Sequence, residues 1–498
     1  MTSEPMKQNQ QENKEGKTGT LHRFKERWAR TRKERQARKA KALQNQKEGQ
    51  PGRLQKTGQF LKTLPERIVF FARHHWSIFA IAVIVVIAVL VHALWPILPI
   101  PITLHLGIFS TSYWQVPESS TYQVVDQVIE RFEQEHPYIH VKYTSGIIKD
   151  DYSQWLAQQI LQGTLPDVFM VLDQDFNLLA SLGALYDLDG LIEKDPSIHW
   201  QDYYQPAIES GLYDHTLYAL PYQCNLKLMF VNQTLLEKEN IPLPDPSWRI
   251  NDFLAICEQV TRDTNQDGVM DQFGQSGYGW DDTMEAYGLE LVDESGNNAL
   301  VNNNQVKSAV QFMRHIRQYE QTSSDTQSVS GFDAGNCVFA PMSLAEYKTY
   351  APYPWKVRKY SAFDWTMLPM PALADGQASA SLDSLMMSIS SRSTHPQKAW
   401  ELLRMFVADP ITQQQVMSQT GGLSPIRAMQ DGAMDGQDLS WDLVSYALEH
   451  SRSKNRFKKF EEASSLVSTG VEEMIRTNTD LDLALLDLQK QLNTLLHE

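Results

Sequence analysis

Residues 165–188 read LPDVFMVLDQDFNLLASLGALYDL. Val168 to Leu172 form a continuous apolar run, which is typical of a parallel strand that is buried on both faces. A helical stretch follows and ends at Gly183. The stretch therefore predicts one strand–helix unit of an α/β protein.

The residues before this stretch repeat the alternation of strand and helix. Residues 102–109 read as a first strand, and residues 122–135 form a helix with one apolar stripe. Residues 139–144 alternate strictly between apolar and polar side chains, as a half-buried strand does. Residues 151–162 read as a second helix. We therefore expect an α/β layer with a mainly parallel sheet.

Ligands of such sheets bind at the carboxyl ends of the strands. Two loops follow strands in this way, residues 110–114 and residues 173–175. Further along the chain, residues 440–498 are helical by pattern, and five leucines between Leu481 and Leu495 repeat at helical spacing. This stripe is short for a coiled coil, so we expect a helix that packs on the globular part.

Upstream, residues 76–95 read WSIFAIAVIVVIAVLVHALW and contain no charged side chain. About 20 residues in a helix span the roughly 30 Å apolar layer of a bilayer. A cleaved signal peptide is the alternative, but 75 residues precede the apolar run, whereas such leaders are short. We therefore predict a retained, single-pass transmembrane helix.

The charges orient this predicted helix. Residues 1–75 contain 19 Lys and Arg and 7 Glu, whereas the rest of the chain contains 26 basic and 53 acidic residues. Basic flanks stay in the cytoplasm, so we expect a cell-membrane protein with a cytoplasmic N-terminus and an extracellular C-terminal domain. Residues 1–75 would be a partly disordered basic arm that contacts the inner leaflet. The acidic outer part argues against nucleic acid as a partner.

Three cysteines, Cys224, Cys257 and Cys337, are spread widely through the outer part. We expect small apolar core residues, with one disulfide as the alternative. The sequence contains no Gly-x-Ser-x-Gly elbow, phosphate-binding loop or His-Glu-x-x-His motif. Asp173 with Asp175, or Asp281 with Asp282, could be proposed as glycosidase carboxylates, but their closeness in sequence does not place them across a scissile bond. We therefore expect a protein that is not an enzyme.

An ordered set of motifs resembles a known family. The stretches LPDVFMVLDQDFNLLASLGALYDL, LYALPYQCNLKLMFVNQTLLEKENIPLPDPSW, NDFLAICEQVT and AWELLRMFVADPITQQQVMSQTGGLSP are similar to motifs of the bacterial extracellular solute-binding proteins of ABC importers. The resemblance is to the carbohydrate-binding group that includes maltose-binding protein. It covers roughly residues 103–430.

This resemblance implies a class II periplasmic-binding-protein-like fold with two α/β lobes and a ligand cleft between them. The chain would cross between the lobes near residues 220–223, 370–375 and 422–425. Together with the predicted N-terminal segments, the implied organisation is a basic arm (1–75), a transmembrane helix (76–95), lobe 1 (103–221 with 372–423) and lobe 2 (222–371 with 424–498).

Sugars bind by stacking on aromatic rings and by hydrogen bonds to polar groups. The loops and strand ends that the resemblance places at the cleft contain both kinds of residue. The predicted ligand-binding residues are Tyr113, Trp114, Asp173, Gln174, Tyr222, Gln223, Trp280, Glu346, Tyr347, Asp383, Ser384 and Gly422.

Residues 263–274 read DTNQDGVMDQFG and follow the start of an EF-hand calcium loop. The predicted ligands are Asp263, Asn265, Asp267, the carbonyl of Val269, and Asp271. Gly274 stands where such loops carry a bidentate Glu, so we expect one weakly held structural Ca²⁺ and no organic cofactor. An acidic turn without metal is the alternative.

The residues and the resemblance together predict a membrane-anchored extracellular protein that captures a saccharide or another small polar solute for an ABC-type importer. Its partners would be the permease subunits of that importer. The alternative is a ligand-sensing ectodomain of the same fold that reports to a membrane signalling partner.

Overall fold

The computed structural model describes residues 83, 85, 101–114, 116, 121–293, 296–321, 332–350, 363–374, 380–429, 440–454, 456–477 and 479–498. The chain divides into two compact units, residues 1–100 and residues 101–498. The predicted basic arm and transmembrane helix lie outside the described residues, apart from Val83 and Val85. Among the residues that are described, no helix is both long enough and apolar enough to cross a bilayer.

The second unit alternates strands and helices along the chain. Its strands are β1 (Ile102–Gly107), β2 (Ile139–Tyr143), β3 (Val168–Val171), β4 (Leu212–Tyr213), β5 (Thr216–Leu217), β6 (Leu220–Asn232), β7 (Phe273–Gln275), β8 (Cys337–Ser343), β9 (Trp365–Leu368), β10 (Ala380–Ile389) and β11 (Ser451–Arg452). Its helices are α4 (Thr121–Glu135), α5 (Lys149–Gln162), α6 (Asp173–Ser181), α7 (Asp189–Ile192), α8 (Gln205–Glu209), α9 (Gln233–Lys238), α10 (Ile250–Val260), α11 (Trp280–Tyr287), α12 (Asn304–Ile316), α13 (Leu344–Tyr350), α15 (Pro396–Val407), α16 (Pro410–Gln419), α17 (Trp441–Glu449), α18 (Phe460–Thr477) and α19 (Leu481–His497).

The strands and helices predicted before residue 172 are confirmed. The apolar stripe of α4 is buried, since Val124, Val125, Val128 and Phe132 have no solvent exposure. β3 is buried along its whole length, as its continuous apolar run predicts. β1 pairs in parallel with both β2 and β3.

The prediction of a mainly parallel sheet holds at this end, and β7 also pairs in parallel with β8 at the far end, but the strands between them are antiparallel. The main sheet has the order β2-β1-β3-β10-β6-β8-β7, and β10 runs antiparallel to both β3 and β6. β6 is also antiparallel to β8 and β9. These antiparallel strands arise because the chain runs from one lobe to the other in β6 and returns in β10.

β6 joins the two lobes. Its first half pairs with β10, and its second half pairs with β8 and β9. All of its residues are buried except Lys227. The pairing of β6 with β10 shifts register between Leu385 and Met386, a local irregularity that bends a strand. A third segment meets the junction where Cys224 and Leu423 exchange backbone hydrogen bonds of 2.9 and 2.8 Å.

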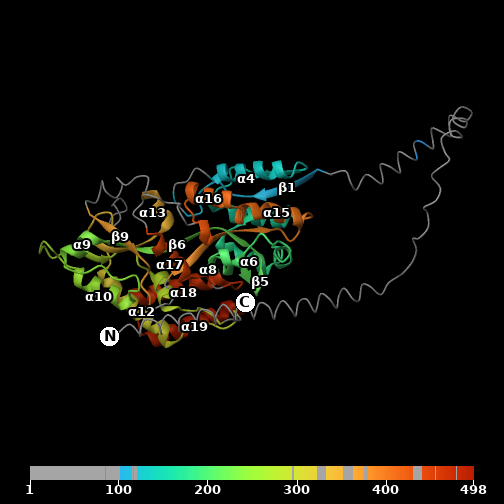
Figure 1. Cartoon of the computed structure of the whole chain (residues 1–498). Helices are drawn as coiled ribbons and strands as arrows, with labels where there is room; N and C mark the ends of the chain where they lie inside the picture. Colours follow the sequence, from blue (N-terminus) through green and yellow to red (C-terminus); the bar gives the residue numbers. More distant parts are fainter. Residues whose placement is uncertain are drawn as a thin grey trace, which may run out of the picture. The chain divides into compact units, whose positions relative to one another are not determined.

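Each lobe has its own hydrophobic core. One core lies among β1, β3, α4, α6 and α15 and includes Phe109, Phe169 and Phe406. A second lies among α10, α12, α18 and α19 and includes Phe253 and Leu485. A third, smaller core surrounds β6 near Leu228 and contains residues of β8, β10 and α17. Figure 1 shows α4 and α15 beside β1, and α9 and α10 in the other lobe.

The last two helices, α18 and α19, pack in the second core. Leu485, Leu488 and Leu492 of α19 are buried in this core, which confirms the prediction of a packed helix.

The three cysteines are free and buried, as expected for core residues.

Candidate functional site

Asp173 begins α6, directly after β3, at the carboxyl end of a parallel strand. Its carboxylate accepts hydrogen bonds from two cations that lie far along the chain. Lys454 Nζ is 3.1 Å from Oδ2, and Arg456 Nη2 is 2.6 Å from Oδ1. The Asp173 side chain is only 8% exposed. The loop at the end of β3 therefore presents a buried charge that is already paired.

These ion pairs shift the pKa values of Asp173 and Lys454. Burial alone would raise the pKa of Asp173, but Arg456 and Lys454 outweigh it and lower the pKa to about 2. Burial likewise opposes the charge of Lys454, whereas Asp383 and Asp173 raise its pKa well above the usual value. Asp173 and Lys454 are consequently both charged at neutral pH.

The cations come from the second lobe. They lie between β11 and α18, and Phe457 in the same segment packs against the second core. The Arg456 guanidinium also lies 5.0 Å from the ring centre of Phe176, which belongs to the first core. The pairs of Asp173 with Lys454 and Arg456, which we call the interlobe clamp, therefore connect the two lobes.

A second cluster of contacts lies where the loop after β1 meets the crossing strand β6. Trp114 Nε1 donates a hydrogen bond of 3.0 Å to Gln223 Oε1, and both side chains are buried. A Cβ on Gly422 would lie 2.6 Å from this Gln223 oxygen and 2.8 Å from Trp114 Nε1. Only glycine fits there without displacement of its neighbours. The first loop, β6 and the loop after α16 are thus packed together.

Tyr113 links this cluster to the clamp. Its hydroxyl accepts a hydrogen bond of 3.3 Å from the Asp173 backbone N–H, and its ring meets Trp114 edge-on at 4.5 Å between centroids. Burial, reinforced by the Asp173 charge, raises the pKa of Tyr113. The hydroxyl is therefore neutral at physiological pH.

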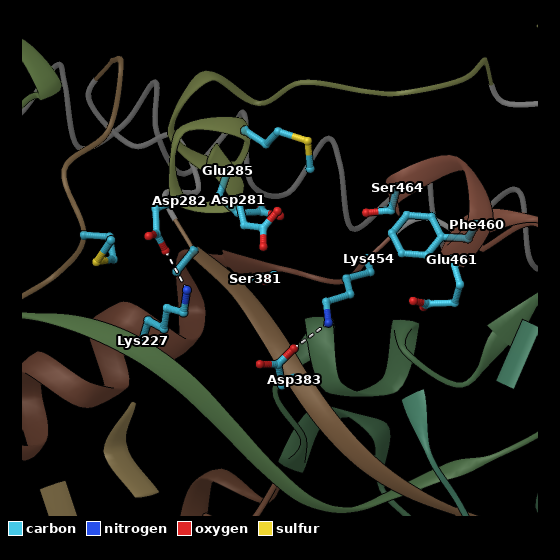
Figure 2. Close-up of a pocket in the computed structure, with 13 residues that line it drawn as sticks. Lys227, Asp281, Asp282, Glu285, Ser381, Asp383, Lys454, Phe460, Glu461 and Ser464 are labelled. Carbon is cyan, nitrogen blue, oxygen red and sulfur yellow. Dashed lines mark hydrogen bonds and ion pairs between the residues drawn. The ribbon is translucent and has the colours of Figure 1, made fainter. Parts of the chain in front are cut away.

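A cavity of about 360 Å³ opens beside the clamp. Lys454 Nζ lies 2.7 Å from Asp383 of β10, and Lys227 Nζ of β6 lies 2.9 Å from Asp282 of α11. Figure 2 shows both pairs among the residues that line the cavity. The lining residues are Lys227, Asp281, Asp282, Met284, Glu285, Met370, Ala380, Ser381, Asp383, Lys454, Phe460, Glu461 and Ser464. The walls therefore combine charged side chains with a few apolar ones, and they include both crossing strands.

The structure brings together six of the predicted ligand-binding residues. They form one continuous region around the clamp and the cavity: Tyr113, Trp114, Asp173, Gln223, Asp383 and Gly422. Their contact with ligand stays a prediction. Asp383 alone among them lines the cavity.

The other predicted residues lie apart from this region or are buried. Trp280 is 4% exposed in the second core, and the Tyr222 ring packs edge-on against Phe406. Tyr347 lies in the junction core, and Ser384 is buried with its hydroxyl 3.2 Å from that of Ser210. Glu346 accepts a hydrogen bond from the Ser343 backbone N–H, and the Gln174 amide donates one to the Ser153 hydroxyl. In this structure the rings of Trp280, Tyr222 and Tyr347 stabilise cores and leave no face open for stacking.

Prediction from the sequence missed Lys227, Lys454, Arg456 and Glu461. Lys454 and Arg456 lie in residues 451–459, where five of nine residues are basic within an otherwise acidic outer part. That run was the available signal. A signal for Lys227 was also present in the sequence, because Lys227 is the single charged residue of the otherwise mostly apolar strand β6.

The predicted calcium loop forms a compact turn. Both oxygens of Asp263 accept backbone N–H groups, from Gln266 and Gly268 at 2.7 Å each, and Gly268 has a φ of 89°. The Asp271 carboxylate accepts from Thr264, and those hydrogen bonds lower its pKa. Within the described part of the chain, no three His, Cys, Asp or Glu side chains gather into a metal site. In this structure these carboxylate oxygens accept hydrogen bonds from backbone N–H groups of the loop itself. The calcium site stays a prediction.

Comparisons with known proteins agree with this architecture. The profile of a family described as "Bacterial extracellular solute-binding protein" matches residues 127–438. The Multiple sugar-binding protein of Streptococcus mutans is 26% identical over 136 residues, which are 27% of this chain and 30% of that relative. The match thus spans less than a third of the relative's length.

Solved structures share the fold. The sugar-binding protein MalE of Xanthomonas citri has a TM-score of 0.67 at 17% identity, covering 79% of this chain and 97% of its own. The cyclic α-maltosyl-1,6-maltose binding protein of Arthrobacter globiformis has a TM-score of 0.63 at 15% identity, and the match covers 80% of this chain and 99% of that protein's chain. Lmo0181 of Listeria monocytogenes, solved in complex with cycloalternan, has a TM-score of 0.62 at 17% identity, with 79% and 99% covered.

These likenesses establish the two-lobed α/β fold of periplasmic binding proteins. The family profile extends over more than half of the chain, from α4 to beyond α16. Proteins of this family bind solutes and are not enzymes, which agrees with the prediction that this chain does no catalysis. The chain belongs to the bacterial extracellular solute-binding protein family.

Proposed function

We propose that this protein captures a saccharide without covalent chemistry and delivers it to an ABC-type importer. The observation that carries the proposal is the polar cavity of about 360 Å³ at the crossing strands β6 and β10. Its volume falls within the range of about 300–1,000 Å³ typical of small-molecule sites. The curated relative is named for binding multiple sugars, and a solved neighbour was obtained with cycloalternan, which supports the choice of a saccharide.

Closure of the lobes would provide the binding energy and the signal to the permease. A solute that contacts both lobes binds the closed form more tightly and shifts the population toward it. Asp383 on β10 and Asp281 on α11 both line the cavity, so a bound solute could contact a crossing strand and the second lobe together. A permease that recognises only the closed form would then receive loaded protein.

We further propose that residues 76–95 anchor the protein in the cell membrane, with residues 1–75 in the cytoplasm. The support is the uncharged apolar run and the excess of basic residues before it. An anchor would keep the binding domain near its transporter and so raise its effective concentration. We also propose that the loop of residues 263–274 binds one structural Ca²⁺. The support is the spacing of its oxygen-bearing side chains.

The test is thermal unfolding of the full-length chain in a mild detergent against a panel of mono- and oligosaccharides. A ligand at about 100 times its dissociation constant adds about 2.7 kcal/mol to the free energy of unfolding. We expect a shift with one class of saccharide. A flat response to every sugar would overturn the saccharide proposal.

Copurification from native membranes separates import from sensing. Recovery of permease subunits with the sugar-loaded protein is the expected result. Recovery of a membrane signalling protein in their place would overturn the importer proposal and support a sensor role.

A further inference from the structure

The charges that line the cavity do not balance. Five carboxylates face it, from Asp281, Asp282, Glu285, Asp383 and Glu461, against two cations, Lys227 and Lys454. Among the residues that the structure describes, Phe460 is the single aromatic residue that lines it, so ring stacking contributes little there. Charge is therefore the dominant chemical feature of the cavity.

Both lysines are already paired. Lys227 Nζ lies 2.9 Å from Asp282, and the pKa of Lys227 is raised because Asp282 outweighs the opposing effect of burial. Lys454 is shared between Asp383 and Asp173, at 2.7 and 3.1 Å. These pairs neutralise Asp282 and Asp383 within the wall.

Glu285 is also paired, by a cation behind the cavity. Arg452 Nε contacts a Glu285 oxygen, and a second contact of 3.5 Å joins Arg452 to Glu290. Arg452 is not among the residues that line the cavity. A ligand would therefore meet Glu285 as a carboxylate that is already held.

Asp281 and Glu461 remain. Both side chains are exposed to solvent, and the structure gives neither a hydrogen bond or an ion pair with any residue that it describes. Their nearest cationic influences are Lys227 for Asp281 and Lys454 for Glu461, and both lysines are paired with other carboxylates. Partial desolvation raises the pKa of Glu461 although Lys454 opposes this. Asp281 is in the first turn of α11 and Glu461 in the first turn of α18, where the helix dipoles favour a negative charge. Figure 2 shows them on opposite sides of the Lys454 side chain.

We propose that the saccharide captured in this cavity carries a protonated amine, whose charge is matched by Asp281 and Glu461. This inference rests on the proposed function and specifies its substrate class. An ammonium group supplies charge-assisted hydrogen bonds, which are roughly twice as strong as neutral ones. A neutral sugar of the same shape would leave two carboxylates uncompensated when closure removes water.

Matched sugars test the proposal on the full-length chain in detergent. Each amino sugar is titrated beside its neutral parent and its N-acetyl derivative: glucosamine with glucose, galactosamine with galactose, and chitobiose with cellobiose. The acetylated forms control for the bulk at the substituted carbon. We expect at least one amino sugar to bind about tenfold more tightly than its two partners, since a hydrogen bond to a charged group contributes about 1.5 kcal/mol or more.

Variants then assign the effect to the cavity. Asp281→Asn and Glu461→Gln should each weaken binding of the amino sugar about tenfold, and this loss should exceed any loss in binding of the neutral parent. Glu462→Gln is the matched control, because Glu462 is the exposed neighbour of Glu461 and does not line the cavity. Added salt should weaken binding of the amino sugar more than that of its neutral parent.

The outcomes separate this inference from the function on which it rests. Tight binding of neutral sugars, with no gain from the amine, would overturn the inference and leave the saccharide proposal standing. A preference for the amine that survives both variants would also overturn it, because the charge would then be matched elsewhere. The absence of binding by any sugar would overturn the proposed function, and this inference with it.

Discussion

Asp173 shows how one side chain joins the lobes. Its pKa in the folded protein is about 2, below the ordinary value of 3.8, so its ionised form is stabilised by folding. That stabilisation, about 2 kcal/mol, is fully present above pH 3.8 and is lost as the pH falls through 2. The clamp therefore holds at any physiological pH.

We expect Asp173→Asn to lower the free energy of unfolding by about 3 kcal/mol, because two cations then lose a buried counter-charge. Urea denaturation measures the change. Asp214→Asn is the control, since Asp214 is exposed in a turn with a φ of 46° that asparagine also adopts readily. Equal stability of the two variants would contradict the role of the clamp.

Gly422 is the second position at which a single residue decides the geometry. We expect Gly422→Ala to destabilise the protein by about 1–3 kcal/mol, because its Cβ would meet the Trp114–Gln223 hydrogen bond. The change should appear in urea denaturation and in a shift of tryptophan fluorescence. Gly190→Ala, where a Cβ meets nothing within 4 Å, should be neutral or slightly stabilising. A fully stable Gly422→Ala protein would show that the loop can move away.

At the scale of elements, the loop between α10 and β7 permits a clear test of the calcium proposal. Extracellular sites of this kind bind with dissociation constants of about 10⁻⁴–10⁻³ M, and the absence of the twelfth-position Glu places this loop at the weak end. We expect millimolar Ca²⁺ to raise the melting temperature of the native chain and not that of Asp263→Asn. Asp214→Asn should respond as the native chain does. If Ca²⁺ does not change the melting temperature of the native chain, the calcium proposal is wrong and the loop is an acidic turn that needs no metal.

For the whole molecule, the proposed anchor predicts how the protein partitions. Because about 20 uncharged apolar residues cross a bilayer, the full-length chain should stay in the membrane pellet after alkaline carbonate extraction. External protease should digest the second unit of intact spheroplasts and leave an epitope at the N-terminus protected. Release of the chain by carbonate, or loss of the epitope, would contradict the anchor or its orientation.

Local pattern was sufficient for the elements of the first lobe. The stripe of α4, the alternation of β2 and the apolar run of β3 each reflect which face of one element is buried, and neighbouring residues record that directly. The order of motifs also indicated the family and hence the two lobes, which the family profile and the fold confirm. The loops after β1 and β3 were expected at the carboxyl ends of strands, and in the structure Tyr113 and Asp173 of these two loops are hydrogen-bonded to each other.

Only the tertiary structure decided how the charges of the candidate site are paired. Asp173 meets Lys454 and Arg456 across 281 and 283 residues of chain, and no local pattern records a contact at that separation. The same holds for aromatic residues such as Trp280, whose burial depends on which helices pack over it. The residue pattern was enough to predict the elements of the first lobe, the family and the supply of polar residues. Folding determined which carboxylates are neutralised and which two are left to face the cavity, because charge pairing depends on distance in space.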